Sequence, residues 1–186
     1  MPLTDVEICN LALGELGEYT ISALTEQSKA ARYCRRFYEP TVQELLREHP
    51  YRFARARATL APDTDEPEFE WAYQHTLPAT CLRVFKVGRV AQVPYTIEGR
   101  KLLTDEEAPE VYYVKRVPEA DFDPLFVTAL SLRIATRICM AMTDNATLYE
   151  TLTKQTANAL NAAKGVSGLE APPEAERESE WVEARY

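Results

Sequence analysis

Residues 125–139 read LFVTALSLRIATRIC, and the apolar pattern of this stretch decides how the rest of the chain can fold. Two stripes run along it at helical spacing: Leu125, Ala129, Leu132, Thr136 and Cys139 form one, and Phe126, Leu130, Ile134 and Ile138 form the other. A helix this apolar must be covered by other elements, so we expect it at the centre of a helical bundle. Arg133 and Arg137 lie one turn apart on it, and each must snorkel, meet a carboxylate or face a partner subunit.

The first fifty residues predict two more helices. Thr4-Asp5-Val6-Glu7 has the pattern of a capping box and precedes a helix expected over residues 5–16, with Gly17 in position to end it. A second helix is expected over residues 26–48 because its apolar side chains fall on one stripe. Pro40 lies inside this second pattern, which predicts either a kink or two abutting helices.

Between residues 51 and 117 the apolar period changes from helical to alternating. Arg55 and Arg57 alternate with alanines, as expected for a half-buried strand. Further strand-like runs, separated by proline, glycine and acidic turns, cover residues 71–77, 82–87, 94–97, 101–104 and 111–116. Glu98-Gly99-Arg100 has the pattern of a hairpin turn. These runs predict a small antiparallel β lobe, inserted between helical segments.

The predicted fold class is α+β and mainly α: a helical bundle of about four helices with an inserted small antiparallel β lobe and a flexible C-terminal tail. Asp144 is expected to cap the fourth helix, and Gly165 is expected to stop it. The expected organisation is the first half of the bundle at residues 1–50, the β lobe at 51–117, the second half of the bundle at 118–164 and the tail at 165–186.

The last segment combines glycine, a proline pair and six glutamates with almost no periodic apolar face. This composition favours a flexible or partner-ordered tail. Trp181 and Tyr186 lie near its end, and aromatic residues in a solvated segment are typical of anchors that dock on a second protein. We therefore expect the tail to bind a partner.

The composition also bounds the function. The chain has 21 Lys and Arg against 29 Asp and Glu, and its net charge of -8 disfavours tight binding of nucleic acid. DNA can still pass close to such a surface without sticking to it. No run approaches the roughly 18 apolar residues of a membrane span, and the N-terminus lacks a signal-peptide pattern, so we expect a soluble chain in the cytoplasm. The four scattered cysteines are expected in the core as small hydrophobes: Cys9, Cys34, Cys81 and Cys139.

A search for catalytic and metal-binding patterns gives no candidate. The sequence contains no Walker-type loop, no G-x-G-x-x-G, no H-E-x-x-H and no calcium-loop motif. Structural roles are expected for His49 and His75. The acidic clusters at residues 63–70 and 105–107 lie beside prolines in turn-like segments, where solvated loops explain them better than paired catalytic carboxylates. We predict no catalytic, cofactor-binding or metal-ligating residue.

Several segments carry a resemblance to a known family: Ile8-Cys9-Asn10-Leu11-Ala12-Leu13, Leu16-Gly17-Glu18, Tyr38-Glu39-Pro40, His49-Pro50-Tyr51-Arg52-Phe53-Ala54 and Trp71-Ala72-Tyr73. They resemble phage tail tubular protein A and related head-to-tail adaptors of short-tailed phages. The likeness extends over residues 5–164, and Tyr51 stands where tryptophan is more usual. These motifs are patterns of packing and turns, so they indicate an architecture more than an activity.

The resemblance implies a virion structural protein without a cofactor. Its members form a homo-oligomer, a dodecameric ring, between the portal protein and a tail nozzle protein similar to tail tubular protein B. DNA passes through the lumen of this ring without specific binding, and no membrane is involved. Such a protein is assembled in the host cytoplasm and ends in the tail of the virion.

Seven arginines give the front half of this acidic chain a locally basic run: Arg32, Arg35, Arg36, Arg47, Arg52, Arg55 and Arg57. They could pair with the acidic tail of a neighbouring copy, with an acidic portal surface or with phosphates of passing DNA, and a solvated face is an equal alternative. The residues predicted to make subunit or portal contacts are Arg35, Arg36, Arg52, Arg55, Arg57, Trp181 and Tyr186.

Two rival functions stay open. Some tail proteins that look like this chain are suspected of cleaving peptidoglycan, so a tail-associated cell-wall hydrolase is one alternative. A monomeric interaction domain of a bacterial host is the other.

Overall fold

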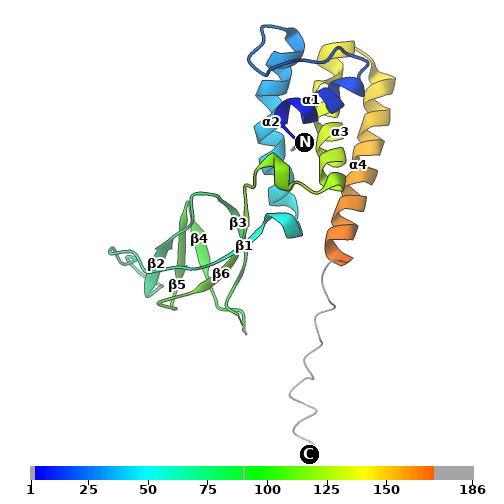
Figure 1. Cartoon of the computed structure of the whole chain (residues 1–186). Helices are drawn as coiled ribbons and strands as arrows, with labels where there is room; N and C mark the ends of the chain where they lie inside the picture. The colour runs from blue at the N-terminus through cyan, green and yellow to red at the C-terminus, as the bar shows by residue number, and fades with distance from the viewer. Residues whose placement is uncertain (1–2, 90, 170–186) are drawn as a thin grey trace, which may run out of the picture.

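The computed structural model describes residues 3–89 and 91–169, and two lobes are visible in it (Figure 1). Within these residues four α-helices form a bundle, and six strands form a β lobe beside one end of the bundle. The predicted class, α+β and mainly α with an inserted antiparallel β lobe, is confirmed. The tail expected at the C-terminus falls largely on residues 170–186, which lie outside the described part of the chain.

The first helix, α1, spans Asp5–Gly14. The predicted capping box is present, because the Thr4 hydroxyl accepts from the Glu7 backbone N–H and the Glu7 carboxylate accepts from the Thr4 N–H at 2.8 Å. The helix ends two residues earlier than expected. Gly17, at φ +71, reverses the chain, and the Glu18 N–H donates to the Leu13 carbonyl.

The second helix, α2, spans Lys29–Glu48 as one element, so of the two predicted outcomes, a kink or two abutting helices, the second was wrong. It begins three residues later than expected because Ser28 caps it by accepting from the Ala31 N–H. Pro40 is tolerated inside the helix because it is exposed, and the Arg36 carbonyl that loses its partner there can be hydrated.

The third helix, α3, spans Pro124–Thr143 and contacts each of the other three helices, as expected for the central element. By length and composition alone it could cross a membrane, contrary to the expectation that no run approaches that size. Its most apolar window is 61% buried against the rest of the protein, however, and the core helix of a soluble protein passes the same test. All four cysteines are buried, as predicted.

The two arginines of α3 meet a carboxylate, which was one of the three predicted outcomes. Arg133 donates to Glu44 of α2 at 2.8 Å, and Arg137 pairs with the other oxygen of the same carboxylate. Arg137 also donates to the Thr41 hydroxyl at 2.9 Å. This shared ion pair fixes α3 against α2 without burying an unpaired charge.

The fourth helix, α4, spans Ala146–Leu169, and the structure corrects both of its predicted ends. Asp144 adopts φ +50 and ends α3, while the Asn145 side chain accepts from the first turn of α4. The helix also continues through Gly165, so residues 165–169, predicted as tail, are helical. A glycine inside a helix costs only about 0.5–1 kcal/mol relative to alanine. The next turn carries the buried Ser167, whose hydroxyl accepts from the Arg52 N–H at 3.1 Å.

The β lobe consists of two three-stranded antiparallel sheets, ordered β1-β6-β3 and β2-β5-β4. The strands are β1 (Arg55–Thr59), β2 (Tyr73–Thr76), β3 (Cys81–Val87), β4 (Thr96–Glu98), β5 (Lys101–Thr104) and β6 (Glu110–Lys115). Each predicted run overlaps one of them, with ends that differ by up to two residues, and the predicted hairpin turn joins β4 to β5 with Gly99 at φ +59. The lobe has its own small core, which includes Val84, Val87, Leu102 and Val111.

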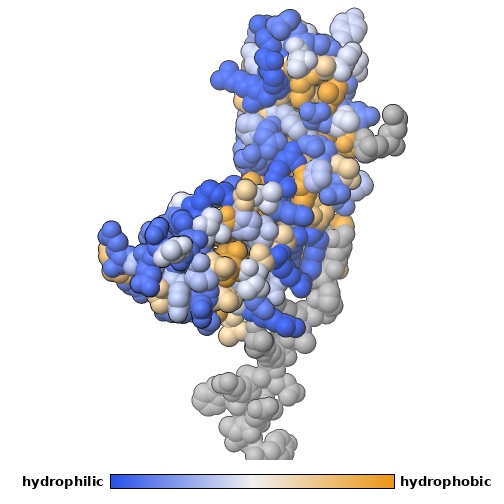
Figure 2. All heavy atoms as spheres, turned by 60° about the vertical axis from the view of Figure 1, so that its left-hand side comes forward, coloured by the Kyte–Doolittle hydropathy of each residue, from blue (hydrophilic) through white to orange (hydrophobic). Residues whose placement is uncertain are grey.

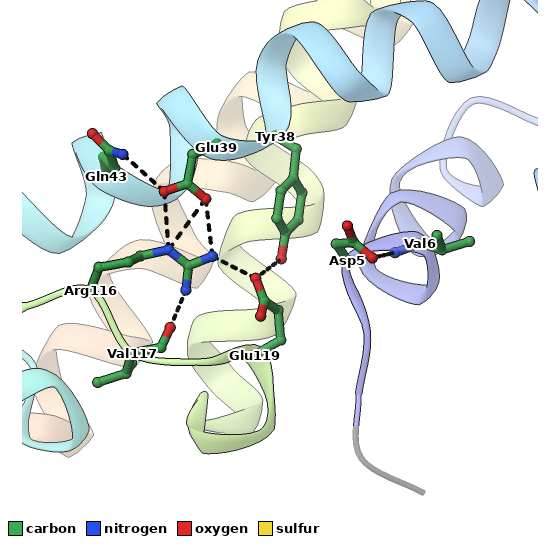
Figure 3. A network of polar contacts seen from close by, with 8 residues as sticks. All are labelled: Asp5, Val6, Tyr38, Glu39, Gln43, Arg116, Val117 and Glu119. Atoms are coloured by element: carbon green, nitrogen blue, oxygen red, sulfur yellow. Dashed lines mark hydrogen bonds and ion pairs between the residues drawn. The ribbon is translucent and has the colours of Figure 1, made fainter. Parts of the chain in front are cut away.

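The lobe is fixed to the bundle by a polar joint that begins where β6 ends (Figure 3). Arg116 donates to the Glu39 carboxylate of α2 at 3.0 Å and to the Glu119 carboxylate at 2.5 Å. The Tyr38 hydroxyl of α2 donates to the same oxygen of Glu119 at 3.2 Å. Burial alone would lower the pKa of Arg116, but its hydrogen bonds with Glu39 and Glu119 outweigh burial and raise it.

Candidate anion-binding groove

The chain leaves α2 through a short arginine-rich segment that becomes the edge of a groove. After His49-Pro50 it forms the 3-10 turn Arg52–Ala54 and then enters β1. Strand alternation places Arg55 and Arg57 on one face of the sheet, while the intervening Ala56 packs against the core of the lobe. The predicted alternation therefore sends the arginines out of the lobe on its solvent side.

Two neighbouring strands supply the floor of the groove. The antiparallel register places Tyr112 of β6 opposite both Arg57 of β1 and Lys86 of β3. The Arg57 guanidinium lies 5.2 Å and the Lys86 ammonium 5.6 Å from the centre of the Tyr112 ring. The Arg55 guanidinium lies 5.3 Å from the centre of the Phe85 ring. These are cation–π distances, so the aromatic floor holds the cations in place without using up their N–H donors.

The groove has a volume of about 450 Å³ and is lined by Arg52, Arg55, Ala56, Arg57, Phe85, Lys86 and Tyr112. Three of these, Arg52, Arg55 and Arg57, were predicted as contact residues from the sequence. Phe85, Lys86 and Tyr112 were missed, because their place beside the arginines depends on strand pairing. The only signal in the sequence was the alternation within the runs 82–87 and 111–116, which sets Lys86 and Tyr112 apart from apolar neighbours.

The cations of the groove have no carboxylate partner among the described residues. The ion pairs of the described residues involve other arginines and lysines, among them Lys164 of α4 with Glu48 of α2 at 3.5 Å. Within residues 3–89 and 91–169, Arg55 donates to the Pro50 carbonyl at 2.7 Å and Lys86 to the Arg89 carbonyl at 3.5 Å. The buried Nε atoms of Arg52 and Arg83 also find no acceptor in residues 3–89 and 91–169. Unsatisfied cationic donors at one place favour an anion.

Nearby titratable groups show the same excess of positive charge. Burial first, and then the charge of Arg52, lowers the pKa of Arg55. Burial, followed by the charges of Lys164, Arg55 and Arg83, lowers the pKa of His49. A bound anion would relieve this repulsion, so the groove is suited to a negatively charged ligand.

The other predicted contact arginines lie elsewhere. Arg35 and Arg36 are exposed on α2, and Arg36 borders a separate surface hollow together with Lys29, Arg32 and Tyr33. Arg36 precedes the end of α2 by twelve residues, which corresponds to about 18 Å along a helix. The structure therefore divides the predicted basic run into two surfaces. Trp181 and Tyr186 lie outside the described residues.

The acidic clusters behave as loops in the part of the chain that the structure describes. Glu66, Glu68 and Glu70 are exposed. Asp63 pairs with Lys101 and accepts from the Thr76 hydroxyl at 3.0 Å. The hydrogen bond from Lys101 is the main reason that the pKa of Asp63 is lowered, which is opposite to what a general acid requires.

The two predicted structural histidines lie in different settings. His75 is fully buried in the lobe, and its ring nitrogens lie 3.0 Å from the Ala61 carbonyl and 3.1 Å from the Glu106 carbonyl. His49 stacks edge-on against Tyr51 at the end of α2. Within the described residues, neither histidine is hydrogen-bonded to a serine or cysteine.

The described residues thus present one built cationic groove, one exposed arginine surface on α2 and an acidic loop at the tip of the lobe. Comparison with known proteins adds no identification, because neither the family models nor the curated proteins contain a match to this chain.

Proposed function

We propose that this chain is a virion structural protein, a subunit of a head-to-tail adaptor ring in a short-tailed phage. Twelve copies form a closed homo-oligomer that joins the portal protein to a tail nozzle protein similar to tail tubular protein B. The ring forms part of the DNA conduit and acts as a connector, without enzymatic activity. The resemblance of residues 5–164 to adaptors of this kind supports the proposal.

The observation that carries the proposal furthest is the separation of charge on the surface. The chain has a net charge of -8, yet Arg35 and Arg36 stand exposed on α2 without an ion-pair partner among the described residues. A head-to-tail ring contact joins two different surfaces of the same chain. Separated basic and acidic surfaces are what such a contact needs if it is to be self-complementary around a circle.

The acidic counterpart is the tip of the β lobe. The connection from β1 to β2 lies at the end of the lobe that is farthest from the bundle (Figure 1). It carries the exposed Glu66, Glu68 and Glu70, and the Phe69 side chain between them is 72% exposed. A charged loop with one projecting aromatic residue suits a contact between subunits in which the Phe69 side chain anchors the loop and the carboxylates pair with arginines of the neighbouring copy.

The surface drawn in Figure 2 is compatible with polar contacts of this kind. Hydrophilic side chains cover most of that face of both lobes, and hydrophobic ones gather in smaller patches. An obligate dimer usually carries a large apolar interface. A mostly polar face favours an assembly whose copies are soluble before they meet, and an acidic lumen lets DNA slide past.

The test is the mass of the purified full chain, measured by light scattering alone and after mixing with its cognate portal ring. A ring-sized species in either case supports the proposal. A monomer that is indifferent to the portal contradicts it and favours a monomeric interaction domain. A loss of turbidity when the chain is added to purified cell walls would favour the hydrolase instead.

The α2 surface has its own test within this experiment. Arg36→Glu is expected to reduce ring formation at least tenfold if the residue faces an acidic neighbour, because repulsion replaces attraction. Lys154→Glu makes the same change of charge on exposed α4 and serves as the matched control. Equal assembly of the two variants would remove the α2 surface from the subunit contact.

A further inference from the structure

We propose that the groove formed by β1, β3 and β6 binds the acidic C-terminal segment of its own chain, residues 170–186. This inference does not rest on the adaptor function. It assigns an occupant to this cationic groove, and it gives cations that have no carboxylate partner among the described residues a partner within the same polypeptide.

The first support is where the described chain ends. The Ser167 hydroxyl near the end of α4 accepts from the backbone N–H of Arg52 at 3.1 Å, and Arg52 lines the groove. Leu169, the last described residue, follows two positions later. The described chain therefore ends close to Arg52, one of the residues that line the groove. An extended chain covers at most about 3.3–3.6 Å per residue, so this segment can reach roughly 55 Å, enough to run along the groove.

The second support is chemical complementarity. Residues 170–186 contain six glutamates against two arginines, together with Trp181 and Tyr186. Glutamate carboxylates are the partners that free guanidinium N–H groups require. The aromatic side chains can join the existing cation–π stacks over Phe85 and Tyr112.

The third support is the energetic advantage of a tether. A short flexible connection gives a linked ligand an effective concentration on the order of 1 mM. A site with a Kd of about 0.1 mM would then be about 90% occupied, although the same peptide added freely at micromolar concentration would leave it almost empty. The tethered carboxylates therefore compete effectively with any free anion, including DNA phosphates, that approaches the groove.

The test uses Trp181 as a reporter in the full chain. The chain has two tryptophans, so Trp71→Phe leaves Trp181 as the sole one. We expect acrylamide to quench Trp181 several-fold less efficiently than it quenches the free synthetic peptide 170–186. This protection should be independent of protein concentration and should disappear at 1 M NaCl, where the Debye length is about 3 Å.

Two sets of variants separate the groove from general effects on folding. Arg57→Glu with Lys86→Glu should expose Trp181 to the level of the free peptide, whereas the matched control Lys29→Glu with Lys154→Glu, on exposed helix surface, should leave it protected. Replacing Glu174, Glu176, Glu178 and Glu180 by glutamine should also expose Trp181. That second set leaves every described residue intact, so it cannot act by unfolding the groove.

Four outcomes would overturn the proposal. Trp181 is as accessible as the free peptide in the parent protein, or its protection survives both sets of variants. Protection that appears only as the protein concentration rises shows that the segment binds another copy. Finally, a duplex oligonucleotide that binds the parent chain and not the Arg57→Glu, Lys86→Glu variant, while Trp181 stays accessible, identifies the groove as a nucleic-acid site.

Discussion

Removing Arg116 should loosen the attachment of the β lobe, and the structure sets the size of the effect. The side chain is 22% exposed and donates to both Glu39 and Glu119, whose side chains are 45% and 25% exposed. Breaking a fully buried pair costs about 3–5 kcal/mol. Because Glu39 regains water, we expect Arg116→Ala to lower the free energy of unfolding by about 2–3 kcal/mol, an intermediate loss between the buried and exposed limits.

Urea titration followed by circular dichroism measures this loss, and Arg36→Ala provides the control. Arg36 is exposed and should change stability by no more than about 0.5 kcal/mol. The double variant Arg116→Ala with Glu119→Ala should lose less than the sum of the single variants, with a coupling of about 0.5–3 kcal/mol. A loss below about 1 kcal/mol for Arg116→Ala, or strictly additive effects, would refute the idea that this joint holds the lobes together.

Three further predictions concern the fold. Burial would raise the pKa of Glu44 and of Glu119, but hydrogen bonds from arginines outweigh burial and lower both below the ordinary 4.5. These carboxylates therefore stabilise the fold above that pH, and urea midpoints should fall as the pH drops below it. His75→Leu removes the ring N–H that donates to one of the two neighbouring carbonyls, of Ala61 or Glu106, and should cost about 1–3 kcal/mol in the same titration. Gly88→Ala should destabilise the lobe, seen as a lower thermal midpoint, because Gly88 has φ +89 and an added Cβ would lie 2.2 Å from the Ala91 carbonyl oxygen; an unchanged midpoint would contradict this.

Local signals in the sequence were enough to predict most elements. The capping box at Thr4 and Glu7 needs only residues three positions apart, and each strand run contains its own alternation. The errors occurred where a distant contact decides the outcome. Gly165 fails to stop α4 because the next turn of the helix packs Ser167 against Arg52, which is 115 residues away in sequence. Asp144 and Asn145 are both residue types that favour the N-cap of a helix. Asp144 has a left-handed backbone and ends α3, so the N-cap of α4 is Asn145.

The candidate site was predictable to a smaller extent. Arg55 and Arg57 stand out as a charged alternation in the sequence, so the basic edge of the groove was found. Its floor was not, because Tyr112 becomes a neighbour of Arg57 only through the register of β1 with β6. The same limit applies to Glu44, whose two arginine partners come from a helix far along the chain. Pairing between distant segments is invisible to a periodicity argument.

The pairing of β1 with β6 has an architectural consequence. Both polypeptide connections between the lobe and the bundle lie at this pair, since Arg55 at the start of β1 faces Val114 near the end of β6. Paired residues of antiparallel strands have Cα atoms only about 4.5–5.5 Å apart. The two chain segments that connect the lobe to the bundle therefore lie close enough together for a tight turn to join them. An insertion joined in this way can be enlarged or exchanged at its far end, whereas the strands next to the bundle must stay, because Val114 of β6 belongs to the bundle core and Leu82 and Phe85 of β3 pack against it.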